Sequence, residues 1–282
     1  MKKNIDKDKE QSTNSSHTSI EFTDFLSRFR FLEEVVNTNP SKWQLYQDHV
    51  TELTNEIFKQ CNRFEDLATS SDNLEIFKRQ FIQCFSEFVR SGSLNRWVID
   101  RPHGYAGDFF IIDQIYQNKL TTSGFERCMD YFLLNSPAAI ATRNRKEDFK
   151  NIVTSFINSS DQEQIRIMNL ACGPCRDVYE LITTFPALKN KVVTFECLDH
   201  DSRALEYASS ILKSAPQRDD IKVVLIKKNA YRIALAKNVT SYVPQGKYHL
   251  IFSTGLIDYF DDSLTRMLVV NLRKLLEYQG LL

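Results

Sequence analysis

The alternation of short apolar runs with amphipathic segments, from residue 165 onward, most constrains the fold of this chain. Runs rich in Val, Ile, Leu and Phe indicate buried strands, and the segments between them have the three- and four-residue spacing of helices. Strands are expected at 165–170, 192–198, 221–226 and 248–253, helices at 177–184, 202–213 and 263–276, and residues 280–282 could open a fifth strand. Strands that alternate with helices predict an α/β fold with a doubly wound parallel sheet.

The part of the chain before this sheet has a different pattern. Residues 1–19 are polar and charged without hydrophobic spacing, which predicts a disordered tail. Residues 20–158 carry apolar side chains at helical intervals, so we expect an all-α N-terminal or cap domain there, followed by the sheet domain at 159–282. Within the helical region the pattern predicts helices at 109–117 and 124–134 and a long one after Ser136-Pro137.

Composition excludes several classes of partner. The chain has 36 Lys+Arg and 36 Asp+Glu, so its net charge is zero and gives no electrostatic basis for binding nucleic acid. No apolar run reaches the roughly 18 residues that cross a bilayer, and the N-terminus lacks the apolar core of a secretory signal. We therefore expect a cytoplasmic protein with reduced cysteines, and the cysteine spacing predicts no structural zinc site.

Glycine is scarce, with 8 residues in 282, so its positions are informative. Glycine is favoured where the backbone needs a positive φ or a close approach to another group. Gly104 and Gly107 belong to the loop Gly-Tyr-Ala-Gly-Asp108, Gly173 follows the first expected strand, and Gly255 follows the fourth. Within the first loop, Asp108 is predicted to cap the helix that begins at Phe109.

The tetrapeptide Cys172-Gly-Pro-Cys175 permits two interpretations. A CxxC between a strand and a helix is typical of thioredoxin-like dithiol oxidoreductases, in which a helix N-terminus lowers the pKa of the first thiol. Alternatively, the same turn faces a nucleotide with its amides, and Asp199 at the end of the next strand accepts the hydroxyls of a ribose. The second interpretation explains the turn, the acidic strand end and the α/β pattern together.

With these features, the sequence resembles a class I S-adenosyl-L-methionine-dependent methyltransferase, whose fold is Rossmann-like. The glycine motif of that family falls on Asn169, Ala171, Gly173 and Cys175, with Asn in place of the usual acid. The resemblance implies that S-adenosyl-L-methionine is the cofactor and that Asp199 binds its ribose. It also implies a polar adenine contact at Asn229, with Ala230 beside it, and a further cofactor-binding motif that includes Ser253 and Gly255.

Three further stretches narrow the resemblance. The sequences Gly104-Tyr-Ala-Gly-Asp108, Arg143-Asn-Arg145 and Ser253-Thr-Gly-Leu-Ile-Asp-Tyr259 occur in the order found in the bacterial extracellular-factor 3-hydroxypalmitic acid methyl ester biosynthesis group. This resemblance implies methyl transfer to the carboxyl oxygen of a hydroxy fatty acid, a small-molecule acceptor. A carboxylate needs no general base, only orientation and a cationic anchor.

The acceptor chemistry gives four candidate catalytic residues. Arg143 and Arg145 could anchor the carboxylate, although a solvated helix face explains them equally well. Tyr105 could approach the sulfonium through a cation–π contact. Tyr259 could line the acceptor pocket, or could simply pack against Phe260.

The family fold has seven strands, and this sequence reaches only the start of the fifth. We therefore expect a C-terminally incomplete sheet whose open edge would be a liability unless a second copy covered it in a homo-oligomer. This expectation adds a third hypothesis beside the methyltransferase and the dithiol oxidoreductase, namely a degenerate, non-catalytic binding or scaffold protein.

Overall fold

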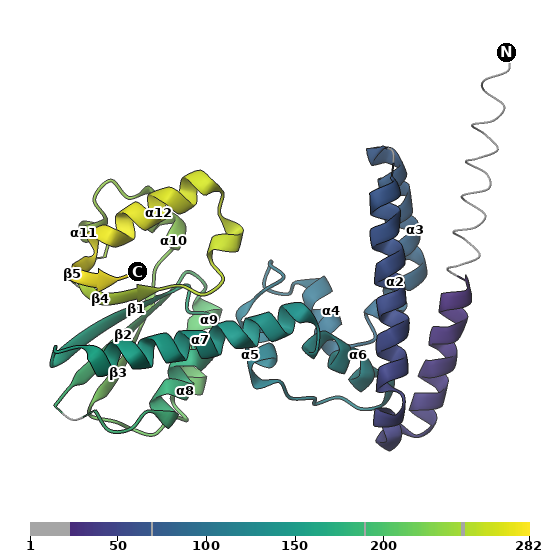
Figure 1. Cartoon of the computed structure of the whole chain (residues 1–282), viewed down its shortest axis with the longest axis horizontal. Helices are drawn as coiled ribbons and strands as arrows, with labels where there is room; N and C mark the ends of the chain where they lie inside the picture. The colour runs from purple at the N-terminus through teal and green to yellow at the C-terminus, as the bar shows by residue number, and fades with distance from the viewer. Residues whose placement is uncertain (1–22, 69, 189, 244–245) are drawn as a thin grey trace, which may run out of the picture. The chain divides into compact units, whose positions relative to one another are not determined.

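The computed structural model describes residues 23–68, 70–188, 190–243 and 246–282 (Figure 1). The predicted disordered tail at 1–19 lies outside these residues. The chain divides into two compact units, one made of residues up to 106 with 118–139, the other of 107–117 with 140–282. The second unit thus takes residues 107–117 and 140–158 from the region expected to form the helical domain, and the boundary expected at 158 stays a prediction.

The first unit is helical. Its described elements are a helix over 23–38, η1 (Pro40–Leu45), α2 (Gln47–Leu67), α3 (Ser71–Val89), α4 (Ser93–Asp100) and α6 (Gly124–Leu134). Aromatic side chains fill its core, where Phe29 stacks on Phe88 at 5.0 Å between ring centroids and Phe64 stacks on Phe77 at 3.7 Å. The helical spacing of apolar residues in this region therefore correctly predicted amphipathic helices with a shared core.

The second unit contains a five-stranded sheet in the order β3-β2-β1-β4-β5. Its strands are β1 (Gln164–Leu170), β2 (Val192–Asp199), β3 (Ile221–Lys227), β4 (Tyr248–Phe252) and β5 (Leu276–Leu281), and every pairing is parallel. The chain moves outward from β1 through β2 to β3 and then returns to the other side of β1 with β4. In such sheets ligands bind beyond the carboxyl ends of the strands where the direction reverses, here at β1 and β4.

Helices cover both faces of this sheet (Figure 1). The helices of this unit are α5 (Phe109–Gln117), α7 (Pro137–Ser159), α8 (Arg176–Thr184), α9 (Ser202–Leu212), α10 (Ala230–Leu235), α11 (Val239–Tyr242) and α12 (Asp262–Lys274), and a short turn, η2 (Ile257–Tyr259), precedes α12. On β1, Ile165 and Ile167 join the apolar cluster with α7, α8 and α9, whereas Met168 and Leu170 join the cluster with α10, α11 and α12. This alternation confirms the doubly wound, Rossmann-like α/β fold.

Candidate functional site

The loop after β1 has an unusual backbone. Ala171, Gly173 and Cys175 all adopt left-handed conformations, with φ of 56°, 51° and 52°. Such conformations are costly for residues other than glycine and are concentrated at functional sites. A Cβ placed on Gly173 would have no atom within 4 Å, so the space above this glycine is open.

Asp199, at the end of β2, points at this loop. One oxygen of its carboxylate accepts the backbone N–H of Gly173 at 3.0 Å, and the other accepts that of Asp201 at 3.0 Å. The residue is only 6% exposed, and a hydrogen bond with it raises the pKa of His200. Since each carboxylate oxygen can accept more than one hydrogen bond, Asp199 keeps acceptor capacity for a ligand beside Gly173.

Asn169 lies at the carboxyl end of β1 and is 1% exposed, and neither its amide nitrogen nor its amide oxygen has a partner among the described residues. A buried, unpaired amide is rare, because each missing hydrogen bond costs free energy. The open glycine, the acidic strand end and the unpaired amide together fit a polar nucleoside ligand with hydroxyl and amino groups.

The strand-end residues after β3 have structural roles of their own. The side-chain oxygen of Asn229 accepts the N–H groups of Tyr231 at 2.8 Å and Arg232 at 3.4 Å and so caps α10. Ala230, the first residue of α10, is buried in the apolar cluster that α10 shares with α11 and α12. The N–H of Lys228 donates to the carbonyl of Asp199 at 2.8 Å and ties these two strand ends together.

The loop after β4 lies next to the loop after β1. Asn169 pairs in register with Phe252, and the hydroxyl of Ser253 donates to the carbonyl of Leu170 at 2.7 Å. Gly255, at φ +92°, faces the guanidinium of Arg145 from α7. Predicted residues from two strands and a distant helix therefore meet at one edge of the sheet.

The second glycine of the Gly-Tyr-Ala-Gly-Asp108 loop, Gly107, lies close to Tyr259. A Cβ on Gly107 would lie 2.8 Å from the hydroxyl of Tyr259, which is itself 58% exposed. Asp108 caps α5 as predicted, since its carboxylate accepts the N–H groups of Phe110 at 3.1 Å and Ile111 at 3.0 Å. Tyr105 belongs to the helical unit and Arg143 is half-buried on α7, so their functional roles remain predictions.

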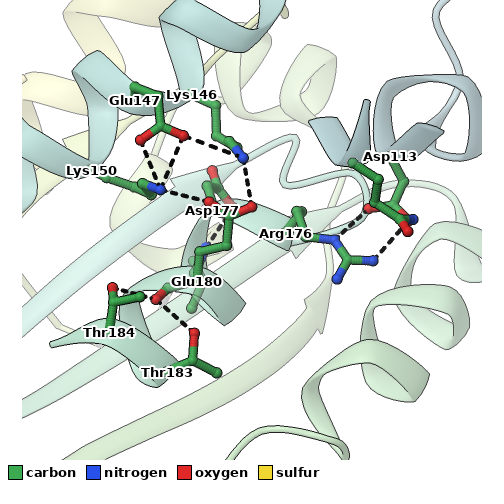
Figure 2. A network of polar contacts seen from close by, with 11 residues as sticks. Asp113, Lys146, Glu147, Lys150, Arg176, Asp177, Glu180, Thr183 and Thr184 are labelled. Carbon is green, nitrogen blue, oxygen red and sulfur yellow. Dashed lines mark hydrogen bonds and ion pairs between the residues drawn. The ribbon is translucent and has the colours of Figure 1, made fainter. Parts of the chain in front are cut away.

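A buried carboxylate on α5, missed by sequence reasoning, joins this helix to the glycine loop (Figure 2). Asp113 is fully buried and accepts two hydrogen bonds from Arg176, at 2.7 Å to Nε and 2.9 Å to Nη2. Tyr207 on α9 and Gln117 also donate to it, at 2.8 and 2.6 Å. Because Arg176 directly follows the Cys172–Cys175 turn, Asp113 fixes α5 beside the candidate site. An acid within the apolar stretch Phe-Phe-Ile-Ile-Asp-Gln-Ile-Tyr-Gln was the available signal.

A second charged network covers the start of α8 (Figure 2). Lys146 and Lys150 of α7 both pair with Glu180, at 2.5 and 2.6 Å, and Lys150 also pairs with Glu147 at 2.8 Å. Asp177 is buried beside this network, and burial raises its pKa to about 6. The long helix α7 is thereby fastened to α8 through charges on both helices.

The cysteines do not have the features of a redox dithiol. Cys172 and Cys175 are free and buried. The hydrogen bond from Cys175 lowers the pKa of Cys172, but burial and the nearby charges of Cys197 and Asp199 raise it overall, to about 12. Reactive dithiols need an exposed thiol with a lowered pKa, so this geometry does not favour the thioredoxin-like interpretation.

Two other types of site were sought over the described ranges. No group of three or more His, Cys, Asp or Glu side chains there could hold a metal ion. Likewise, none of the helices within those ranges combines the length and the apolar character that a membrane crossing requires.

Comparisons with solved structures give matches at low sequence identity. A possible exported protein from Bordetella parapertussis is 19% identical with a TM-score of 0.50, over 68% of this chain and 60% of that chain. The glycopeptide N-methyltransferase MtfA, complexed with (S)-adenosyl-L-methionine, is 18% identical with a TM-score of 0.34, over 48% of this chain and 51% of its own. An rRNA methylase from Streptococcus thermophilus is 16% identical with a TM-score of 0.31, over 46% of this chain and 66% of its own.

The first of these likenesses shows a shared fold alone, and this chain spans between about half and two thirds of the length of the three proteins. No protein-family model and no curated protein matches the chain.

Proposed function

We propose that this chain is an S-adenosyl-L-methionine-dependent methyltransferase that acts on a small molecule. The observation that supports it most is the pairing of Asp199 with the N–H of Gly173 beneath open space. A buried carboxylate and a left-handed glycine at neighbouring strand ends form a surface for a ribose. The unpaired amide of Asn169 adds hydrogen-bonding capacity at the same edge.

The proposal gives each strand end a part of the cofactor. Asp199 accepts the ribose hydroxyls, Ala171 and Gly173 let the backbone approach the ligand closely, and Asn169 faces its amino-acid end. Asn229 and Ala230 contact the adenine, and the strand end that carries Ser253 and Gly255 closes the pocket. When bound, S-adenosyl-L-methionine supplies an activated methyl group, so the residues of the chain need only bind and orient the reactants.

The acceptor is proposed to be the carboxyl group of a hydroxy fatty acid, following the resemblance of three sequence stretches. A carboxylate is already an anion, so in-line orientation is the main requirement, and it can supply on the order of 7–11 kcal/mol. Arg143 and Tyr259 are proposed to line the acceptor side of the pocket.

Calorimetric titration with S-adenosylhomocysteine tests the cofactor site. Asp199→Asn keeps an acceptor for the N–H of Gly173 but removes the charge, so the affinity should fall by at least about 10-fold, as for hydrogen bonds to charged groups. Gly173→Ala places a methyl group in the open space and should abolish binding, with only about 1 kcal/mol lost from the stability of the free protein for a left-handed alanine. Asp220→Asn is the matched control, since this carboxylate lies at the amino end of β3, whereas the candidate site lies at the carboxyl ends of the strands.

Binding that is absent in the unaltered chain, or equal in all three variants, would contradict the proposal and leave the scaffold hypothesis. A methyl-ester product from radiolabelled cofactor and 3-hydroxypalmitate tests the acceptor separately. A methylated product from another class of acceptor would keep the enzyme and exclude this substrate.

A further inference from the structure

The guanidinium of Arg145 packs against the loop that follows β4. A Cβ placed on Gly255 would lie 3.0 Å from Nη2 and 3.2 Å from Nη1 of this arginine. Such a contact is tighter than most Cβ contacts, so a side chain at position 255 would displace the guanidinium by a few tenths of an ångström, and φ of +92° also favours glycine there. The glycine of the Ser253-Thr-Gly stretch thus makes space for a charged group from a different part of the chain.

The side chain of Tyr116, on α5, lies beside the same guanidinium. Burial and the charge of Asp177 raise the pKa of the Tyr116 hydroxyl, and interactions with Arg145 and with the hydroxyl of Thr254 oppose this rise. Tyr116 is 8% exposed, and the ammonium of Lys146 lies 5.4 Å from the centre of its ring. Three polar groups from α5, α7 and the loop after β4 therefore lie close together, and the charges of both Arg145 and Asp177 act on Tyr116.

No carboxylate in the described part of the chain pairs with Arg145. Three other half-buried arginines of this unit each pair with a carboxylate: Arg166 with Glu196, Arg176 with Asp113, and Arg218 with Asp220. The Nε of Arg145, moreover, is buried without a hydrogen-bond partner. A buried donor left unpaired costs on the order of 1–3 kcal/mol, so this arginine lacks the anion that its surroundings provide for the others.

We propose that Arg145, Tyr116 and Thr254 form a carboxylate-binding subsite. A guanidinium holds a carboxylate through two parallel hydrogen bonds, and the two hydroxyl groups can donate further ones. The subsite rests on the proposed function for its ligand, because the loop after β4 adjoins the loop after β1 through Ser253 and Leu170. Two carboxylates can reach this edge, the one at the methionine end of the cofactor and the one of an acid acceptor.

Paired ligands distinguish these two sources. S-adenosylhomocysteine carries the amino-acid carboxylate, and 5′-methylthioadenosine is the same nucleoside without it. If the cofactor supplies the carboxylate, Arg145→Gln should weaken S-adenosylhomocysteine by at least about 10-fold and leave 5′-methylthioadenosine unchanged. If the acceptor supplies it, both nucleosides should bind as before, and the affinity for 3-hydroxypalmitate should fall by a similar factor.

Arg273→Gln is the matched control, since this exposed arginine lies in the last turn of α12, away from the loop after β4. Tyr116→Phe removes one hydroxyl without removing charge and should reduce the affinity for the same ligand by about 2- to 10-fold. Equal affinities for all three ligands in Arg145→Gln and Arg273→Gln would overturn the inference. If neither nucleoside binds the unaltered chain, the proposed function fails, and the titration with 3-hydroxypalmitate still decides whether the subsite exists.

Discussion

Replacement of Asp113 by asparagine tests whether the buried ion pair holds α5 on the sheet unit. The carboxylate accepts four hydrogen bonds, two from Arg176 and one each from Tyr207 and Gln117, and it has no exposure to solvent. Asparagine has one acceptor oxygen, and its amide group must face one of these donors. Breaking a buried pair by removing one partner costs about 3–5 kcal/mol, and the 17% exposure of the Arg176 side chain puts the expected loss near 3 kcal/mol.

Urea denaturation followed by far-UV circular dichroism measures this loss. With a slope of about 2–3 kcal/mol/M, the midpoint of Asp113→Asn should fall by about 1 M. Glu126→Gln is the control, because the Arg96–Glu126 pair is exposed, at 48% and 38%, and such pairs contribute less than about 1 kcal/mol. A midpoint shift for Asp113→Asn no larger than that of the control would refute the argument that this contact fastens α5.

Three further predictions concern polar groups of the sheet unit. Burial raises the pKa of Asp177 to about 6, above the roughly 3.9 of an unfolded chain, so ionisation of this group opposes folding as pH rises. The stability of Asp177→Asn relative to the unaltered protein should therefore increase by about 2 kcal/mol between pH 4 and pH 7 in denaturation curves. The pH dependence expected for Asp220 is the opposite. Arg218 lowers the pKa of this carboxyl group to about 2, so the stability that the ion pair contributes is lost as pH falls from 4 toward 2. The hydroxyl of fully buried Tyr248 donates to Glu196 at 2.6 Å, so Tyr248→Phe should cost about 1–3 kcal/mol in thermal or urea unfolding, whereas Tyr278→Phe, at 91% exposure, should cost nothing measurable.

The strands could be predicted because their signal is local. The expected strand at 165–170 is observed as β1 (Gln164–Leu170), and that at 192–198 as β2 (Val192–Asp199). Each is an apolar run covered by helices on both faces, so hydrophobicity alone marks it. The six-residue helix α10 was missed because it is too short for a helical period to emerge, although Asn229 before it is a recognisable capping residue.

The N-terminal helices show where local pattern fails. The break Asn39-Pro40-Ser41 before an apolar spacing that starts at Trp43 favours Ser41 as the N-cap of a helix, but residues Pro40–Leu45 form a 3-10 helix and α2 starts at Gln47. The hydroxyl of Ser41 donates to the side chain of Asn39 instead of capping a helix. The apolar positions were correct, yet the exact start of a helix depends on turn geometry that apolar spacing does not report.

The strand-end residues of the site were predictable for a topological reason. Parallel strands bring their carboxyl ends to one edge, so Gly173 and Asp199 must lie near each other once the sheet is inferred, and the structure joins them by a hydrogen bond. The helical residues have no such constraint. Asp113 and Arg176 are 63 positions apart, and no periodicity relates them.

A different signal would have found the helical contributors. A charged residue inside an apolar stretch must be paired when it is buried, because an isolated buried charge is very costly. Asp113 follows four apolar residues, and its partner is Arg176. Arg145 differs because it is half-buried in a polar stretch, but its Nε is buried without a partner and no carboxylate of the described residues pairs with it. The need to pair a buried charge, which Asp113 and Arg176 meet inside the fold, is therefore the physical basis for proposing an anionic ligand at Arg145.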